Sequence, residues 1–197
     1  MKYSLTLFKG DVAVVAAAFL LYVGSFQVNQ FLASYTILPS VLGLMFLPAG
    51  VKLLTLLWGR LPAAMGLFIA HVYLDGPLWP LFHDQATYYL SATSVGSYVL
   101  AVFLLMRWQW IHENLSNLRY GHLVGFSLAA SVLNGLLQSL VLMRPDKIEF
   151  NSFFWTHSAQ IAFGDFLGCF AIVVIFNAAI ITFDEIRKYV CSPNVLR

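Results

Sequence analysis

The sequence predicts an all-α fold, a polytopic transmembrane bundle of about six helices. Hydrophobic residues make up 60% of the 197 positions and charged residues only 10%. Mean hydropathy is +0.78, far from the composition of soluble globular domains. No segment has the polar composition of a soluble catalytic or binding module. We therefore expect residues 1–197 to form a single integral membrane domain.

Six apolar stretches are long enough to cross a bilayer, which takes about 20 apolar residues per helix. They are residues 11–27, 35–58, 61–80, 88–106, 121–143 and 155–183. Lys2 and Lys9 precede the first stretch, as in a signal peptide, but no small-residue cleavage site follows, so we expect a retained helix. Hydropathy leaves open whether residues 70–90 span the membrane, re-enter it or lie flat.

The second stretch contains Pro48 and Gly50 near its middle. Proline removes a backbone donor and glycine loosens the chain, so this helix is expected to be kinked or broken near Pro48-Gly50. Backbone groups freed there need partners inside the bundle, because lipid supplies none. Lys52 would lie roughly 12 Å along a helix from Arg60, within snorkelling reach of the interface. Two interpretations stay open: a simple kink, or a kink that opens a pocket or binds an anionic group.

The basic residues predict the orientation by the positive-inside rule. Between the predicted stretches lie the connections Gln27–Gln30, Gly59-Arg60 and Phe82–Gln85, then the Arg107–Arg119 linker and Arg144–Lys147. In a six-helix arrangement only Arg144 and Lys147 fall on one side, while the other side has Lys2, Lys9, Lys52, Arg60, Arg107, Arg119, Arg187, Lys188 and Arg197. Both termini are therefore expected in the cytoplasm, in a membrane such as the bacterial inner membrane. The net charge of +2 gives no reason to expect nucleic-acid binding.

Asp165 is the first candidate for a functional side chain. It stands inside the last apolar stretch, where a charged residue costs at least about 2.5–3.5 kcal/mol at the bilayer centre, so it should face protein, water or a partner. Counting back along a straight helix from Asp184 places it about 28 Å away, near the outer leaflet. At that depth Lys52 is not expected to be its direct partner unless the broken helix re-enters.

Several histidines and polar groups are expected at a similar depth. His71 and Asp75 are four residues apart on one helical face, and the others are His83, Asp84, His157 and Gln160. Together they could titrate between about pH 5 and 8 or bind a divalent metal. Alternatively, they are separate interfacial residues wetted by outside water. No compact ligand motif is present, so we assign no metal, and the scattered histidines indicate no haem or quinone cofactor.

Two further patterns concern the fifth stretch. Asn134 and Gln138 form a polar stripe at i and i+4, which in membranes more often ties helices together than binds a ligand. Gly125-Phe126-Ser127 is superficially similar to the Gly-x-Ser motif of intramembrane rhomboid proteases, with His157 in the next stretch. Ser127 and His157 are expected at opposite ends of their helices, far beyond the roughly 3 Å that proton transfer requires. We therefore expect no catalytic residues and no enzymatic activity.

Three short motifs carry a family resemblance. They are Leu47-Pro48-Ala49-Gly50, Gly59-Arg60-Leu61-Pro62, and Phe163-Gly164-Asp165-Phe166-Leu167-Gly168. This pattern resembles bacterial MASE-type membrane-associated sensor domains of the first class. Those domains are integral helical bundles that usually precede histidine kinase or diguanylate cyclase modules. The present chain departs from them in having about six spans rather than about eight, and in having no output module after Arg197, so the resemblance implies action through another chain.

The leading functional expectation is a non-catalytic, sensor-like or accessory membrane subunit. It would assemble, among membrane lipids, with another membrane protein or a cytoplasmic signalling protein. The Arg107–Arg119 linker and the charged run from Asp184 to Tyr189 would provide the contacts. The alternative is a small transporter or a substrate-binding transport subunit, with Asp165 and the Pro48 break lining a path. A third interpretation, a purely structural accessory protein, differs from the first only in lacking a signal.

Overall fold

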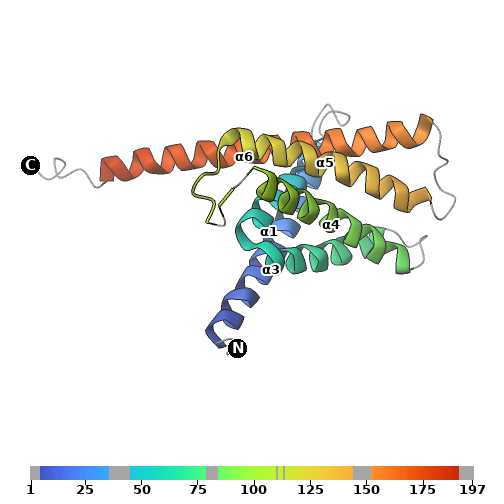
Figure 1. Ribbon diagram of the computed structural model, residues 1–197, viewed down its shortest axis with the longest axis horizontal. Helices are drawn as coiled ribbons and strands as arrows, with labels where there is room; N and C mark the ends of the chain where they lie inside the picture. The colour runs from blue at the N-terminus through green and yellow to red at the C-terminus, as the bar shows by residue number, and fades with distance from the viewer. Residues whose placement is uncertain are drawn as a thin grey trace, which may run out of the picture.

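The computed structural model describes residues 5–35, 45–78, 84–109, 111–112, 114–143 and 152–190 (Figure 1). Within these ranges the regular structure is entirely α-helical. The helices are α1 (Leu5–Tyr35), α3 (Leu47–Leu78), α4 (Asp84–Trp108), α5 (Tyr120–Met143) and α6 (Ser152–Val190).

All five helices are long and apolar enough to cross a membrane, as expected of an integral membrane protein. The qualifying segments are Gly10–Ser34, Leu47–Leu74, Thr87–Trp108, Tyr120–Leu142 and Phe154–Ala179. The predicted stretches 11–27, 88–106, 121–143 and 155–183 each fall on one of these helices. The predicted connection at Gln27–Gln30 is wrong, because α1 continues as a helix through these polar residues to Tyr35.

The second and third predicted stretches share one helix, α3, which contains a sharp kink. Arg60 has φ 49° and ψ −129°, a non-helical conformation that L-residues rarely adopt. Lys52 before the kink and His71 after it both approach Ser94 of α4, so the two parts of α3 converge on the same neighbour. The predicted connection at Gly59-Arg60 thus coincides with an abrupt change of direction.

The predicted break near Pro48-Gly50 is wrong in its position within the helix. α3 begins at Leu47, so Pro48 lies in its first turn rather than near its middle. Proline is tolerated there because a first-turn N–H has no intrahelical acceptor. The sequence reasoning assumed a helix that began before Pro48, whereas residues 45 and 46 are not helical.

The start of α3 is anchored inside the bundle by two hydrogen bonds. The backbone N–H of Leu47 donates to Asn29 Oδ1 of α1 at 3.1 Å, and that of Phe46 donates to the Gly164 carbonyl of α6 at 3.1 Å. Gly168 allows this approach, because a Cβ there would overlap the Phe46 carbonyl oxygen. Backbone groups at the helix start therefore have protein partners, as expected where lipid offers none.

α3 is the central element of the bundle and contacts α1, α4, α5 and α6. α6 is the longest helix, at 39 residues, or about 58 Å at 1.5 Å per residue. That length exceeds the roughly 30 Å hydrocarbon core of a bilayer. Figure 1 shows α6 running along the bundle and continuing beyond it at its C-terminal end.

Candidate functional site

A buried lysine lies at the centre of the candidate site. Lys52 of α3 has 0% exposed surface, and its Nζ donates a hydrogen bond to Ser94 Oγ of α4 at 2.6 Å. The ammonium lies 4.5 Å from the ring centroid of Tyr98 and 5.9 Å from that of Tyr22, within the range of cation–π attraction. Lys52 therefore points into the bundle, and the expectation of a snorkelling lysine is wrong.

His71 joins this lysine from the other side of the α3 kink. Its Nε2 lies 3.3 Å from Ser94 Oγ, and its ring is 4.5 Å from the Tyr22 ring of α1. The side chain is buried. Ser94 is thus shared between an ammonium and an imidazole that come from the two parts of one helix.

Asp165 of α6 supplies the negative charge. Its Oδ2 accepts hydrogen bonds from Tyr98 Oη at 3.0 Å and from Asn134 Nδ2 at 2.6 Å. The side chain is 4% exposed, and Tyr98, which donates to it, also lies against the Lys52 ammonium. We refer to Lys52, His71, Ser94, Tyr98, Asn134 and Asp165 as the polar cluster.

Tyr98 connects the two charged residues of the polar cluster. Its ring faces Lys52, its hydroxyl donates to Asp165, and it has no exposed surface. A buried charge is tolerated in an apolar interior only when it is paired and hydrogen-bonded. Ser94, Tyr98 and Asn134 supply the hydrogen bonds and the cation–π contact of Lys52 and Asp165, and Tyr98 brings the two opposite charges to one ring.

Asn134 extends the polar cluster along α5. While its amide donates to Asp165, its carbonyl oxygen accepts from Ser97 Oγ at 3.2 Å and from Gln138 Nε2 at 3.3 Å. Asn134 thus connects α5 to α4 and α6, in agreement with the prediction that it ties helices together, whereas the Gln138 bond lies within α5. Asn134 also donates to the Asp165 carboxylate, a contact that the helix-packing interpretation did not predict.

Lys52 and Asp165 meet through Tyr98, whose ring faces the ammonium and whose hydroxyl donates to the carboxylate. The expectation that Lys52 is not the direct partner of Asp165 stays a prediction, while the depth expected for Asp165 is wrong. Asp165 lies close to the middle of the apolar segment Phe154–Ala179, rather than at its outer end. Counting back from Asp184 was misleading because α6 remains helical to Val190, well past that segment. The kink at Arg60 and the start of α3 at Leu47 also change the depth of Lys52.

His157 does not join the polar cluster. Its Nδ1 faces Ser139 Oγ of α5 at 3.1 Å, and Gln160 is exposed on α6. The side chains of Asp75, His83 and Asp84 lie outside the described part of the molecule. In the described residues no three His, Cys, Asp or Glu side chains gather as a metal site would require.

The remaining candidates from the sequence lie outside the polar cluster. Pro48 and Gly50 are buried where α3 meets α6, and a Cβ at Gly50 would lie 2.5 Å from Ile172 Cβ. Arg60 is exposed at the kink. Ser127 Oγ donates to the Leu123 carbonyl at 2.8 Å, while His157 contacts Ser139 instead.

Sequence reasoning missed Ser94, Tyr98 and Tyr22. Ser91, Ser94 and Tyr98 recur at three- and four-residue spacing on one face of α4, the same kind of polar stripe that indicated Asn134 and Gln138. That stripe could have marked α4 as a helix facing the polar interior. Tyr22 stands among apolar residues of α1 and carries no comparable signal.

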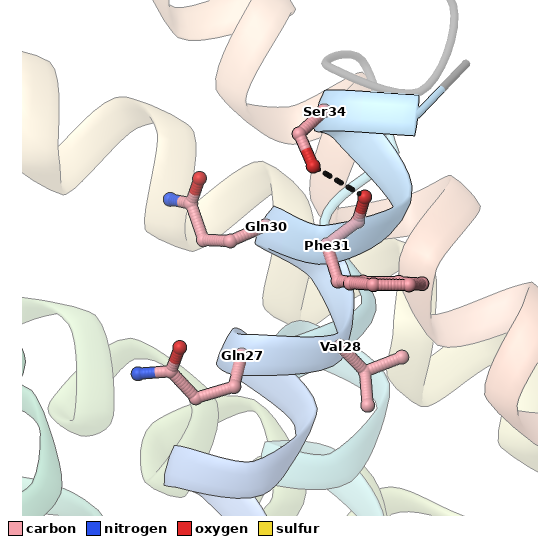
Figure 2. A pocket seen from close by; sticks show the side chains of 5 residues that line it. All are labelled: Gln27, Val28, Gln30, Phe31 and Ser34. Carbon is pink, nitrogen blue, oxygen red and sulfur yellow. Dashed lines mark hydrogen bonds between the residues drawn. The ribbon is translucent and has the colours of Figure 1, made fainter.

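A separate hollow lies on the outside of α1 (Figure 2). Its lining residues, Gln27, Val28, Gln30, Phe31 and Ser34, are all exposed and come from this one helix. Ser34 Oγ donates to the Phe31 carbonyl at 2.8 Å, while the Gln27 and Gln30 amides point away from the Phe31 ring. Because no second element among the described residues contributes to it, this hollow carries no functional assignment.

The chain matches no protein-family model, no curated protein and no solved structure. The functional interpretation therefore depends on the polar cluster and the helices that carry it.

Proposed function

We propose that the protein is a non-catalytic integral membrane subunit, sensor-like or accessory, that acts by assembling with a partner protein. The observation that carries the proposal is the continuity of α6. This helix contributes Asp165 to the polar cluster and also forms the C-terminal projection beyond the bundle (Figure 1). A change in the packing around Asp165 would displace or rotate a helix that a partner can contact.

The projection has the properties of a contact segment. From Ala179, where the apolar segment ends, α6 continues to Val190, a distance of roughly 16 Å at 1.5 Å per residue. The sequence of this part includes Asp184, Glu185, Arg187 and Lys188. Charged residues on an extended helix suit contact with a membrane-proximal protein in the cytoplasm.

The polar cluster supports a sensing role over a purely structural one. Replacing a buried ion pair by apolar residues of similar volume is often neutral or stabilising, so stability alone does not require Lys52 and Asp165. Ionisable residues within membrane helices commonly mark functional sites. Through Tyr98 these two residues connect α3, which also contacts α1, α4 and α5, to α6, which continues beyond the bundle.

The proposed kinship with the first class of MASE-type sensor domains gains one structural argument. Two of the motifs that carry the resemblance meet in space, because Phe46 next to Leu47-Pro48 donates to Gly164, and Gly168 lies against the Phe46 carbonyl. Motifs that are far apart in the sequence but packed together are typical of a shared structural feature. The resemblance adds the expectation of a partner with an output module.

We further propose that both termini lie in the cytoplasm of a bacterial inner membrane. The change of direction at Arg60 supports an even number of membrane passages. Lys52 before Arg60 and His71 after it both reach Ser94 of α4, so the two parts of α3 are counted as two passages. The distribution of basic residues is consistent with that orientation. Proteolysis of the C-terminal segment in vesicles of known orientation would test it.

The proposed function can be tested by affinity purification from the native membrane in mild detergent, followed by mass spectrometry. We expect a stoichiometric partner with the wild-type chain. Reversal of the four charges at Asp184, Glu185, Arg187 and Lys188 should abolish its recovery. A matched control reverses Asp11, which is exposed on α1 and lies outside both the Arg107–Arg119 linker and the projection. Recovery of the protein alone, monodisperse, would contradict the proposal.

A transport function is the second candidate, and the burial of Lys52 and Asp165 in the middle of the bundle favours it. Charged residues at that depth are common in ion and substrate pathways. A transporter should show solute uptake in proteoliposomes that Asp165→Asn abolishes. Uptake that survives this substitution, or no uptake of any tested solute class, would remove the candidate.

A further inference from the structure

The polar cluster contains an uninterrupted set of proton donors and acceptors around Ser94. A lysine ammonium carries three donors and no acceptor, whereas a hydroxyl carries one donor and two lone pairs. Since Lys52 Nζ donates to Ser94 Oγ at 2.6 Å, the hydroxyl is the acceptor in that bond. Its own hydrogen is free to point to His71 Nε2, 3.3 Å away. This arrangement requires neutral His71 to carry its proton on Nδ1.

We propose that the polar cluster is a proton-binding site in which Ser94 relays a proton between Lys52 and His71. In the transfer, an Nζ–H bond of Lys52 breaks as Ser94 Oγ takes that hydrogen, while the original Ser94 O–H bond breaks and an Nε2–H bond forms on His71. The products are a neutral amine on Lys52 and an imidazolium on His71. One positive charge therefore moves from the part of α3 before the kink to the part after it, and the net charge is conserved.

The surroundings select a proton over a larger ligand. Lys52 and Tyr98 have no exposed surface, and Ser94 has 2%. A species that exchanges with these groups must travel along hydrogen bonds rather than through open space. The titratable groups that face this relay are Tyr22 from α1, Tyr98 from α4, and Asp165 and Cys169 from α6, while α5 contributes the amide of Asn134.

The position of the positive charge determines how well Asp165 is compensated. With the charge on Lys52, the ammonium faces the Tyr98 ring, whose hydroxyl donates to the carboxylate. With the charge on His71, the ring lies against Tyr22 instead. Proton transfer would therefore move the positive charge away from the Tyr98 ring, whose hydroxyl holds Asp165, and a proton taken up at Asp165 would remove the negative charge there.

This inference deepens the proposed function by naming the proton as the ligand of the polar cluster. It rests on the proposed function only in treating proton binding as a signal to a partner. Its test uses the full chain alone in lipid nanodiscs, labelled with ¹⁵N at histidine and lysine, with NMR over about pH 5 to 8. The His71→Gln variant assigns the His71 signals. Because no partner is present, a failed partner purification leaves this test intact, and a negative result here leaves the partner proposal standing.

We expect neutral His71 in the Nδ1-protonated tautomer, with Nε2 as a hydrogen-bond acceptor. We also expect its titration to shift the Lys52 Nζ signal. Ser94→Ala should abolish that shift, and Ser94→Thr, which keeps a hydroxyl, should retain it. Ser139→Ala, the matched removal of the serine that contacts His157, should leave it unchanged. If Ser94→Ala fails to fold, the tautomer of neutral His71 in the wild-type protein tests the proposal. An Nε2-protonated neutral His71, or a Lys52 shift that persists in Ser94→Ala, would overturn the proposal.

Discussion

Replacing Lys52 by methionine removes one charge of the buried pair with little change in side-chain length. The lysine has 0% exposed surface, so an apolar chain of similar size fits the same space. The substitution deletes the hydrogen bond to Ser94 and the cation–π contact with Tyr98. Above all, it removes the positive charge that faces Tyr98, the donor to the Asp165 carboxylate.

The uncompensated Asp165 carboxylate determines how much stability the Lys52→Met variant loses. Breaking a buried charge pair by removing one partner costs about 3–5 kcal/mol, so Lys52→Met should lower the free energy of unfolding by that amount. Asp165→Asn should cost about as much, because it strands the lysine. Both hydrogen bonds to Asp165 end on Oδ2, and the amide oxygen of asparagine can accept both, so this variant isolates the charge.

The double variant provides the decisive comparison. With neither charge present, Lys52→Met combined with Asp165→Asn should cost much less than the two single effects together, with a coupling energy of at least about 2 kcal/mol. Reversible unfolding in bicelles measures all four free energies, and Arg119→Met, at an exposed position, should change stability by less than about 0.5 kcal/mol. Single effects that add to within about 0.5 kcal/mol would refute the reasoning, because independent sites behave that way.

Two further predictions concern the packing that holds the polar cluster in place. Gly168→Ala should destabilise the bundle by about 3 kcal/mol or more, because the added Cβ would overlap the Phe46 carbonyl oxygen; Gly96→Ala, with nothing within 4 Å of the added Cβ, should be neutral or slightly stabilising in the same unfolding assay. Asn29→Ala should cost about 0.5–2 kcal/mol by removing the acceptor for the Leu47 N–H, while Gln30→Ala at an exposed neighbouring position should cost less than about 0.5 kcal/mol. Equal effects within either pair would contradict these packing assignments.

The fold class could be predicted from composition and hydropathy, because long apolar segments in a bilayer have few alternatives to helices. Four predicted stretches correspond to one helix each. The boundary after residue 27 could not be predicted, because Gln27, Asn29 and Gln30 indicate a loop by polarity alone. Asn29 is instead retained in α1, where its side chain binds the backbone of a distant helix.

The candidate site could be predicted in four of its six members but not in its connections. Lys52, His71, Asn134 and Asp165 were singled out as ionisable or polar groups inside apolar segments. Their convergence depends on the kink at Arg60 and on the depth at which α3 meets α6. The kink coincides with the connection predicted at Gly59-Arg60, but the depth at which α3 meets α6 is not encoded in a local pattern. Both properties determine which polar groups come within hydrogen-bond distance.

Photo-crosslinking from the projecting part of α6 would test most directly that the protein acts through a partner. Thr182 is exposed on this helix beyond the apolar segment, whereas Phe176 is exposed within it. A photoreactive residue at position 182 is predicted to capture one protein that also co-purifies stoichiometrically with the wild-type chain, and the same group at position 176 is predicted not to capture it. Failure to capture that protein from position 182, or equal capture from both positions, would contradict the account.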